Sequence, residues 1–344
     1  MNRRDLLRGR PRRSAVETSF EAAAQAPSTG TGADYWIRVH RRAMACRFEI
    51  TLSGEDAGHV AAAREALDEV DRIEAALSVF RETSELVRVN REANLRATAT
   101  DGDLFSLLLA CARLHQETQG AFDVTSTPLS RTWGFLKREG RLPSPVEIAS
   151  ARARVGMDAV ELVTERRTVR FLRPGMELNL GSIGKGHALA RVGDLLRGRG
   201  VTDALVSAAG SSVLAVGGRD GGWVVDVRSR QIRRSRLARL TLRDCALGTS
   251  GAGEQFVDVA GRRYGHVLDP RTGWPAAGLI SVSVVADDAA QADALSTAFL
   301  VGGLDLAERY CESHPRTLAL VTPDDGSERP RVLGGHPGAS LEEA

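Results

Sequence analysis

The stretch that says most about the fold is Leu178-Asn179-Leu180-Gly181-Ser182-Ile183-Gly184-Lys185-Gly186-His187. An apolar strand here enters a glycine-rich turn, and a helix is expected from about Lys185. Such a unit directs backbone N–H groups and the positive end of the helix at an anion. It is not a Walker A loop, because Asn179 and Gly186 stand where that loop needs its first glycine and its Ser or Thr. The stretch therefore predicts either an anion site or an ordinary strand-to-helix turn.

Strands and helices alternate irregularly on both sides of this stretch. Apolar residues at helical spacing predict helices over about 57–79, 104–119, 185–197 and 289–301, the last ending at Gly302 and Gly303. Shorter apolar or alternating runs predict strands at 36–39, 48–52, 160–163, 168–171, 176–180, 204–207, 212–216, 223–227, 239–242 and 280–285. Hairpins interspersed with helices indicate an α+β sandwich rather than a regular βαβ wind.

The 344 residues are predicted to form one large domain between two unstructured ends. Residues 1–34 are rich in Arg, Ala, Ser, Thr and Gly without apolar periodicity, which indicates a flexible Arg-rich leader. The globular domain is expected over 35–330, and 331–344 read as a disordered tail. The leader begins like a twin-arginine export signal but lacks the apolar segment that such signals need. We therefore expect a cytoplasmic protein, with export to the cell envelope as the alternative.

Charge and cysteine usage argue against several classes of protein. The 46 Lys and Arg residues nearly balance the 44 Asp and Glu residues, which argues against a nucleic-acid binder. No apolar run approaches the ~20 residues of a membrane span. The four cysteines lie far apart, which predicts neither a zinc site nor a disulfide framework. No Gly-x-Ser-x-Gly, His-Glu-x-x-His or EF-hand pattern occurs, so α/β-hydrolases, zincins and calcium sensors are excluded.

Two further stretches carry side chains suited to catalysis. Asp293 and Thr297 lie at positions i and i+4 of the helix predicted over 289–301, so they share one face. Their neighbours are small or apolar, and a buried carboxylate needs a partner, either Mg²⁺ or an Arg or backbone N–H. His266 lies three residues before Asp269, where a strand runs into a turn. It is either a general base oriented by a carboxylate or a structural histidine.

The order of these stretches along the chain resembles the ApbE family of flavin transferases over about 39–323. The matching blocks are 44–49, 77–90, 121–123, 178–186, 250 with 266–275, and 292–297. The resemblance implies an α+β fold, an ApbE-like two-lobed sandwich of mixed antiparallel sheets and helices with an FAD cleft between the lobes.

The resemblance also implies a reaction, the Mg²⁺-dependent transfer of FMN from FAD onto a threonine of an acceptor flavoprotein, with release of AMP. This reaction is protein flavinylation, a post-translational modification. FAD is then the substrate, Mg²⁺ the cofactor and the acceptor protein the partner. The alternatives that the sequence leaves open are an FAD pyrophosphatase, which yields FMN and AMP, and a non-catalytic FAD-binding protein.

Roles for individual residues follow from the resemblance. Asp293, Thr297 and the carbonyl of Ser182 are implied to hold Mg²⁺ against the pyrophosphate of FAD, and His266 to deprotonate the acceptor threonine. Phosphoryl-type transfer is mainly positioning and charge neutralisation, so a metal and a base suffice. The residues implied to line the FAD pocket are Met44, Phe80, Ala121, Phe122, Asp123, Asn179, Lys185 and Leu268.

The chain departs from the usual pattern of the family at several of these positions. Residues 45–46 read Ala-Cys where Gly-Thr is usual. Residues 207–212 read Ser-Ala-Ala-Gly-Ser-Ser, where the family commonly has an Asn and a Gly-Gly-Asp run. Asn179 stands where Asp is frequent, and Ser296 where some members have a second acid. The loss of acids predicts weaker metal binding or altered hydrogen bonding to the flavin. Phe80 stands where Tyr is frequent, which keeps the stacking surface.

Overall fold

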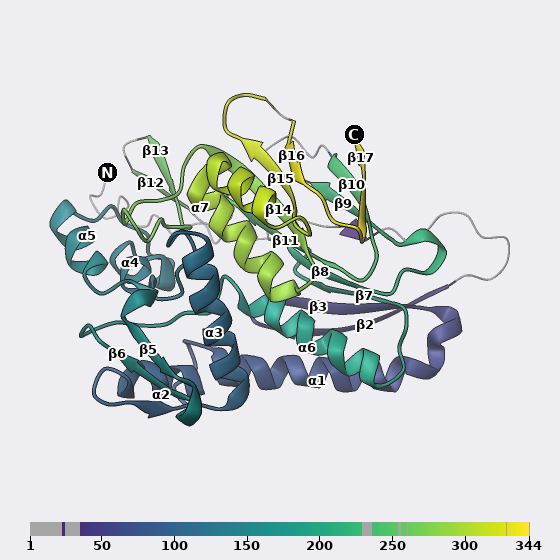
Figure 1. The fold of residues 1–344 in the computed structure, drawn as a ribbon, viewed down its shortest axis with the longest axis horizontal. Helices are drawn as coiled ribbons and strands as arrows, with labels where there is room; N and C mark the ends of the chain where they lie inside the picture. Colours follow the sequence, from purple (N-terminus) through teal and green to yellow (C-terminus); the bar gives the residue numbers. More distant parts are fainter. Residues whose placement is uncertain are drawn as a thin grey trace, which may run out of the picture.

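The computed structural model describes residues 23–24, 35–228, 236–253, 256–259, 261–327 and 329–343. The predicted leader, 1–34, lies outside the described residues except for 23–24. An antiparallel sheet of eight strands forms the centre (Figure 1). Its strand order is β16 (Arg331–Gly334), β15 (Leu318–Pro323), β14 (Leu279–Ala286), β11 (Ala246–Gly251), β8 (Ser212–Val216), β7 (Ala204–Ala208), β3 (Cys46–Ser53) and β2 (Trp36–Ala43).

A second antiparallel sheet covers one face of the first, in the order β1 (Ala23–Ala24), β9 (Trp223–Arg228), β10 (Arg236–Leu242) and β17 (Ala339–Glu343). Successive residues of a strand point to opposite faces. Val213 and Ala215 of β8 therefore pack against the second sheet, whereas Leu214 and Val216 pack on the other side. That other side is covered by the helices α1 (Val60–Leu77), α6 (Gly184–Gly198) and α7 (Ala289–Ser313) (Figure 1). One layer of helices and two layers of sheet result, which confirms the α+β prediction.

A helical unit lies beside these layers, at the left of Figure 1. Its elements are α2 (Glu85–Glu92), α3 (Gly102–Glu117), α4 (Thr127–Thr132), α5 (Pro145–Arg152), and a small sheet in the order β4 (Thr98–Ala99), β6 (Thr168–Phe171) and β5 (Val160–Val163). Leu108 and Phe122 of this unit share one buried cluster with Leu295 and Phe299 of α7, so the core is continuous. A separate hairpin consists of β12 (Phe256–Val259) and β13 (Arg262–Gly265). In the described part of the chain, no helix is long and apolar enough to cross a membrane.

The segment 176–180, predicted as a strand, is not part of a sheet; its backbone meets residues 124–126 through an isolated bridge between Glu177 and Ser126 and a hydrogen bond from the Asn179 N–H to the Val124 carbonyl at 2.8 Å. Side chains bond further backbone groups of the segment. Asn90 accepts a hydrogen bond from the Leu178 N–H at 2.7 Å and donates one to the Leu178 carbonyl at 2.9 Å. Asn94 donates to the Met176 carbonyl at 3.1 Å. Two asparagines, on α2 and just after it, thus take the place of a neighbouring strand and lead the chain into the glycine turn before α6.

The helix predicted to end at Gly302 and Gly303 is interrupted there, because Gly303 has the non-helical angles φ 79° and ψ −174°. A second helical segment, which the sequence did not predict, continues α7 to Ser313 and buries Leu306 and Tyr310. The predicted end of the globular domain is wrong. Residues 331–343, predicted as a disordered tail, contain β16 and β17. These strands extend both sheets, because each finds an unpaired edge, on β15 and on β10.

The first turns of α7 lie very close to two glycines. A Cβ atom on Gly186 of α6 would lie 2.1 Å from the carbonyl oxygen of Ala289, and a Cβ on Gly248 of β11 would lie 2.4 Å from that of Ala292. Both distances are too short for any side chain, so the backbone of α7 reaches its position only because glycines stand there. This close packing fixes the position of Asp293.

We expect the substitution Gly186→Ala to lower the free energy of unfolding by about 1–3 kcal/mol, because its methyl group collides with backbone that cannot rotate away. The matched control is Gly198→Ala at the end of the same helix, where an added Cβ meets nothing within 4 Å. Helix propensity predicts that the control is neutral or more stable by up to about 1 kcal/mol. Urea unfolding of both variants measures the difference, and equal stabilities would show that α7 is free to shift.

Candidate active site

One cavity of about 410 Å³ lies between the sheet layers, the helical unit and the loop that follows β13. Every residue predicted to bind metal or FAD or to transfer a proton lines this cavity, except Met44. The predicted residues on its walls are Phe80, Ala121, Phe122, Asp123, Asn179, Ser182, Lys185, His266, Leu268, Asp293 and Thr297. Stretches that are far apart in the sequence therefore meet in one place.

Asp293 is 3% exposed and is engaged on both carboxylate oxygens. The Ser212 hydroxyl donates to Oδ1 at 2.9 Å, and the Gly186 N–H donates to Oδ2 at 3.1 Å. The Lys185 Nζ lies 3.7 Å from Oδ1. These neighbours compensate the cost of burying a carboxylate. Because N–H groups in the first turn of a helix have no partner within it, Asp293 also caps α6 from a different helix.

Oxygen atoms that suit a hard cation surround Asp293. The hydroxyls of Thr297 and Ser250 are 3.0 Å apart, and Ser250 also contacts Ser296 at 2.8 Å. No backbone N–H of the described residues donates a hydrogen bond to the Ser182 carbonyl. Across the same ranges no group of three or more His, Cys, Asp or Glu could hold a metal ion. Mg²⁺ needs only one or two carboxylates when water and phosphate oxygens complete its shell, so these residues fit Mg²⁺ bound together with a phosphate.

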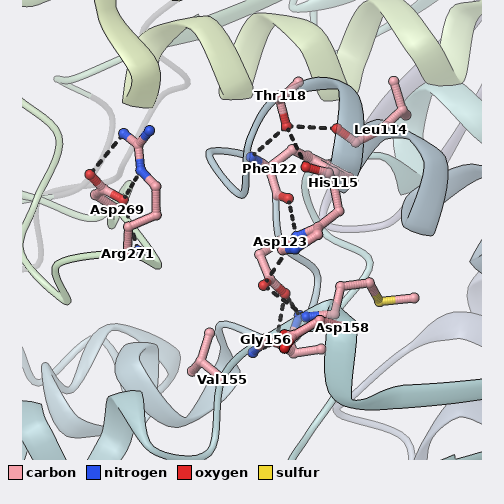
Figure 2. A network of polar contacts seen from close by, with 12 residues as sticks. Leu114, His115, Thr118, Phe122, Asp123, Val155, Gly156, Asp158, Asp269 and Arg271 are labelled. Atoms are coloured by element: carbon pink, nitrogen blue, oxygen red, sulfur yellow. Dashed lines mark hydrogen bonds and ion pairs between the residues drawn. The ribbon is translucent and has the colours of Figure 1, made fainter.

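Asp123 lines the cavity from the helical unit, and its carboxylate is bonded within the protein (Figure 2). Its Oδ1 accepts hydrogen bonds from the N–H and the hydroxyl of Thr125. Its Oδ2 accepts from the Met157 N–H at 3.1 Å and lies 3.3 Å from Nδ1 of His115. That nitrogen is also 3.1 Å from the Phe122 carbonyl, and because both neighbours are acceptors it carries the proton. The network holds Phe122 against the cavity.

His266 follows β13 at the foot of the hairpin. Its ring packs edge-on against Phe135, with the ring centroids 6.5 Å apart. In the turn that follows, the Gly273 N–H donates to the Asp269 carbonyl at 2.7 Å. The two carboxylate oxygens of Asp269 accept hydrogen bonds from Nε and Nη2 of Arg271 at 2.9 and 3.0 Å, which raises the pKa of Arg271 above its ordinary value. Asp269 therefore orients Arg271.

The turn that carries Met44 is not among the segments that line the cavity. Met44 and Ala45 join β2 to β3 with φ of 49° and 57°, and the Met44 N–H donates to Glu74 at 2.9 Å. This left-handed geometry costs a residue such as alanine about 1–2 kcal/mol. Burial raises the pKa of the neighbouring Cys46 thiol to about 11, so this thiol is neutral at physiological pH.

Several lining residues carry no motif that reveals them in the sequence. Thr127 is the most informative, because it is 2% exposed and its hydroxyl has no hydrogen-bond partner in the described structure. A buried polar group without a partner costs about 1–3 kcal/mol, which a ligand that bonds it would recover. Phe80, which the family resemblance did predict, is in contrast 76% exposed at the rim of the cavity, and its ring is available for stacking. Other lining residues to which the sequence assigned no role include Ser126, Ser130, Phe135, Leu136, Arg138, Ser211, Thr249 and Ser250.

Residues 44–321 match the ApbE family. Similar curated proteins named FAD:protein FMN transferase include those of Treponema pallidum (30% identical over 81% of this chain and 82% of the relative) and Vibrio cholerae (30% identical, 75% and 80%). Solved structures of similar fold include an ApbE protein from Thermotoga maritima, with TM-score 0.76 and 28% identity over 90% of this chain and 97% of that one. The apo form of the Pseudomonas stutzeri flavinyl transferase ApbE has TM-score 0.76 and 26% identity over 87% and 95%. These likenesses confirm the predicted combination of helices and antiparallel sheets.

We expect Asp123→Asn to lower the free energy of unfolding by about 1–3 kcal/mol, because an amide accepts hydrogen bonds on one oxygen only and leaves buried donors unpaired. The matched control is Asp258→Asn on β12, where the carboxylate is 57% exposed and 3.5 Å from Arg263. The control should change stability by no more than about 0.5 kcal/mol. Urea unfolding measures both, and equal losses would contradict the role given to the Asp123 network.

Proposed function

The chain belongs to the ApbE family, and on that premise we propose that it is an FAD:protein FMN transferase, which uses Mg²⁺ to move FMN from FAD to a threonine of an acceptor protein. The observation that carries the proposal is the meeting of three groups in one cavity: the buried Asp293 carboxylate, the Ser182 carbonyl, to which no described backbone N–H donates, and His266. A buried carboxylate and free oxygens suit a metal–phosphate complex, and an imidazole on another wall suits proton removal.

FAD has chemically distinct parts, and the cavity offers a matching group for several of them. The exposed ring of Phe80 provides a face for stacking of the flavin. Lys185 and the first turn of α6 provide positive charge for the pyrophosphate. The buried hydroxyl of Thr127 provides a hydrogen bond to a polar edge of the ligand. These contacts hold the phosphorus of the FMN half where an acceptor can reach it.

Asp293, Thr297 and the Ser182 carbonyl would hold Mg²⁺, which supplies charge neutralisation at the pyrophosphate when it is bound. The Ser212 hydroxyl and the Gly186 N–H keep the Asp293 carboxylate in one orientation, since each occupies one of its oxygens. The second lone pair of each oxygen is left for a ligand.

His266 takes the proton from the hydroxyl of the acceptor threonine. The hydroxyl oxygen forms a bond to the phosphorus of the FMN half, and the bond from that phosphorus to the bridging oxygen breaks. AMP leaves with the bridging oxygen, and FMN remains on the threonine through a phosphoester bond. Water in the place of the threonine would give free FMN and AMP.

The proposal is tested by incubating the protein with FAD, Mg²⁺ and a threonine-bearing acceptor peptide, followed by denaturation and separation of the products. Flavin fluorescence that stays with the denatured peptide supports the transferase. Free FMN and AMP without labelled peptide would instead indicate a pyrophosphatase, and intact FAD bound to the protein would indicate a binding protein.

We expect His266→Ala to lower the transfer rate by about 10²–10⁴-fold, the usual contribution of a general base. FAD affinity, measured by fluorescence quenching, should stay within a few-fold, because the imidazole acts on the acceptor. His40→Ala is the matched control, since His40 is exposed on β2. Unchanged transfer by His266→Ala would refute the assignment of the base.

We expect Asp293→Asn to weaken Mg²⁺ binding at least tenfold, because Asp293 is the only carboxylate among the three proposed ligands. The readout is the rise in melting temperature that Mg²⁺ gives to the FAD-loaded protein, which reports binding without turnover. Asp305→Asn, on an exposed position of the same helix, is the control. An undiminished Mg²⁺ effect in Asp293→Asn would place the metal elsewhere.

A further inference from the structure

A second hollow, of about 470 Å³, lies against the cavity of the active site and has no part in the chemistry described so far. The two hollows share Asp123 and Pro270 as lining residues, so they lie on either side of a common wall. We call the second one the basic groove. Its lining residues are His115, Asp123, Ala149, Arg152, Ala153, Val155, Gly156, Arg173, Pro270 and Arg271.

The ionisable side chains of the basic groove are three arginines, one histidine and the carboxylate of Asp123. Asp123 offers little negative charge to a ligand, because it is buried and accepts hydrogen bonds from Thr125 and Met157 while His115 lies beside it (Figure 2). The groove therefore presents mainly positive charge and N–H donors.

Two of the arginines are held in fixed orientations. Asp269, which faces Arg271, binds its Nε and Nη2, so the guanidinium is locked on the wall of the groove (Figure 2). Arg173 donates to the Val155 carbonyl at 2.7 Å and to Asp158 at 2.9 Å. These acidic partners neutralise part of the charge of the two arginines but leave further N–H groups of each guanidinium unused.

Arg152, at the end of α5, is different because its side chain has no hydrogen bond or ion pair with any described residue. Its stem lies against the turn after His266, since a Cβ on Gly273 would come within 3.1 Å of the Arg152 Cγ and Cδ. The guanidinium is exposed, and all its donors are available. A guanidinium pairs best with a planar, two-oxygen anion such as a carboxylate.

The chain itself limits the distance between the groove and the proposed base. His266 lines the active-site cavity and Arg271 lines the basic groove, five positions later in the sequence. Five residues span at most about 18 Å when fully extended, and the turn between these two is folded back. A protein whose threonine reaches His266 therefore has neighbouring residues within reach of Arg152.

We propose that the basic groove binds a carboxylate side chain of the acceptor protein, located within about five residues of the threonine that receives FMN. The inference rests on the proposed transferase function and names the chemistry by which that enzyme selects its acceptor. Arg152 makes the ion pair, and Arg271 supplies further N–H donors on the wall of the groove.

The test uses the full-length, FAD-loaded protein and fluorescein-labelled peptides with one threonine in a Gly/Ser background. One series carries an aspartate at each position within about five residues of the threonine, and the matched series carry asparagine or lysine there. Fluorescence anisotropy measures binding of each peptide, and flavin attached to the peptide measures transfer. The variants are Arg152→Glu and, as a control with the same charge change, Arg166→Glu on the exposed turn between β5 and β6.

We expect wild type and Arg166→Glu to bind the best aspartate peptide about tenfold more tightly than its asparagine partner, the scale of one charge-assisted pair. Arg152→Glu should lose this preference and favour lysine at the same position. The proposal is overturned if wild type shows no preference for aspartate, or if Arg152→Glu keeps it. It is also overturned if FAD affinity falls in parallel in Arg152→Glu or if free AMP displaces the peptide from the groove, because the groove would then serve the nucleotide. Peptide binding without flavin attachment would refute the transferase and not the groove.

Discussion

The structure depends on the close approach of the α7 backbone to α6 and β11, which two glycines permit. Gly186 and Gly248 let the carbonyls of Ala289 and Ala292 come nearer than any side chain would allow. The Asp293 carboxylate then reaches the first turn of α6 and the Ser212 hydroxyl. A packing constraint between backbones thus decides where the negative charge of the site lies. The small residues around Asp293 follow from the same constraint, since larger ones would separate α7 from its neighbours.

The wall formed by the helical unit is held by hydrogen bonds rather than by close backbone packing. Asn90 bonds both backbone groups of Leu178, and Asp123 bonds donors from its own loop and from Met157. Such networks are stabilising only when every member is satisfied. These hydrogen bonds also fix the orientation of the wall, because each amide or carboxylate holds the segment that it bonds in one position. Ligand contacts on this side therefore depend on buried hydrogen bonds within the protein.

Local patterns in the sequence predicted most of the regular elements, because helical periodicity and strand alternation are properties of neighbouring residues. The grouping of the candidate residues in one cavity came from the family resemblance, and all but Met44 lie there. What the sequence could not reveal are contacts between distant residues. The run 176–180 alternates like a strand, and nothing in the sequence indicates that the Asn90 side chain, 88 positions from Leu178, bonds its backbone. The short, polar β17 shows no core-forming pattern until β10 provides an edge.

The strand order of the two sheets has a consequence for how the protein comes to fold during synthesis. β2 and β3 form at the start of the described domain, but the large sheet is completed only by β14, β15 and β16, and the second sheet by β17. Pairing between residues far apart in sequence carries a large loop-closure entropy and slows folding. Helix α7, which brings Asp293, also belongs to this late part. Synthesis must therefore pass α7 before the chain can assemble the pocket, and until then the edges of the incomplete sheets are exposed to aggregation.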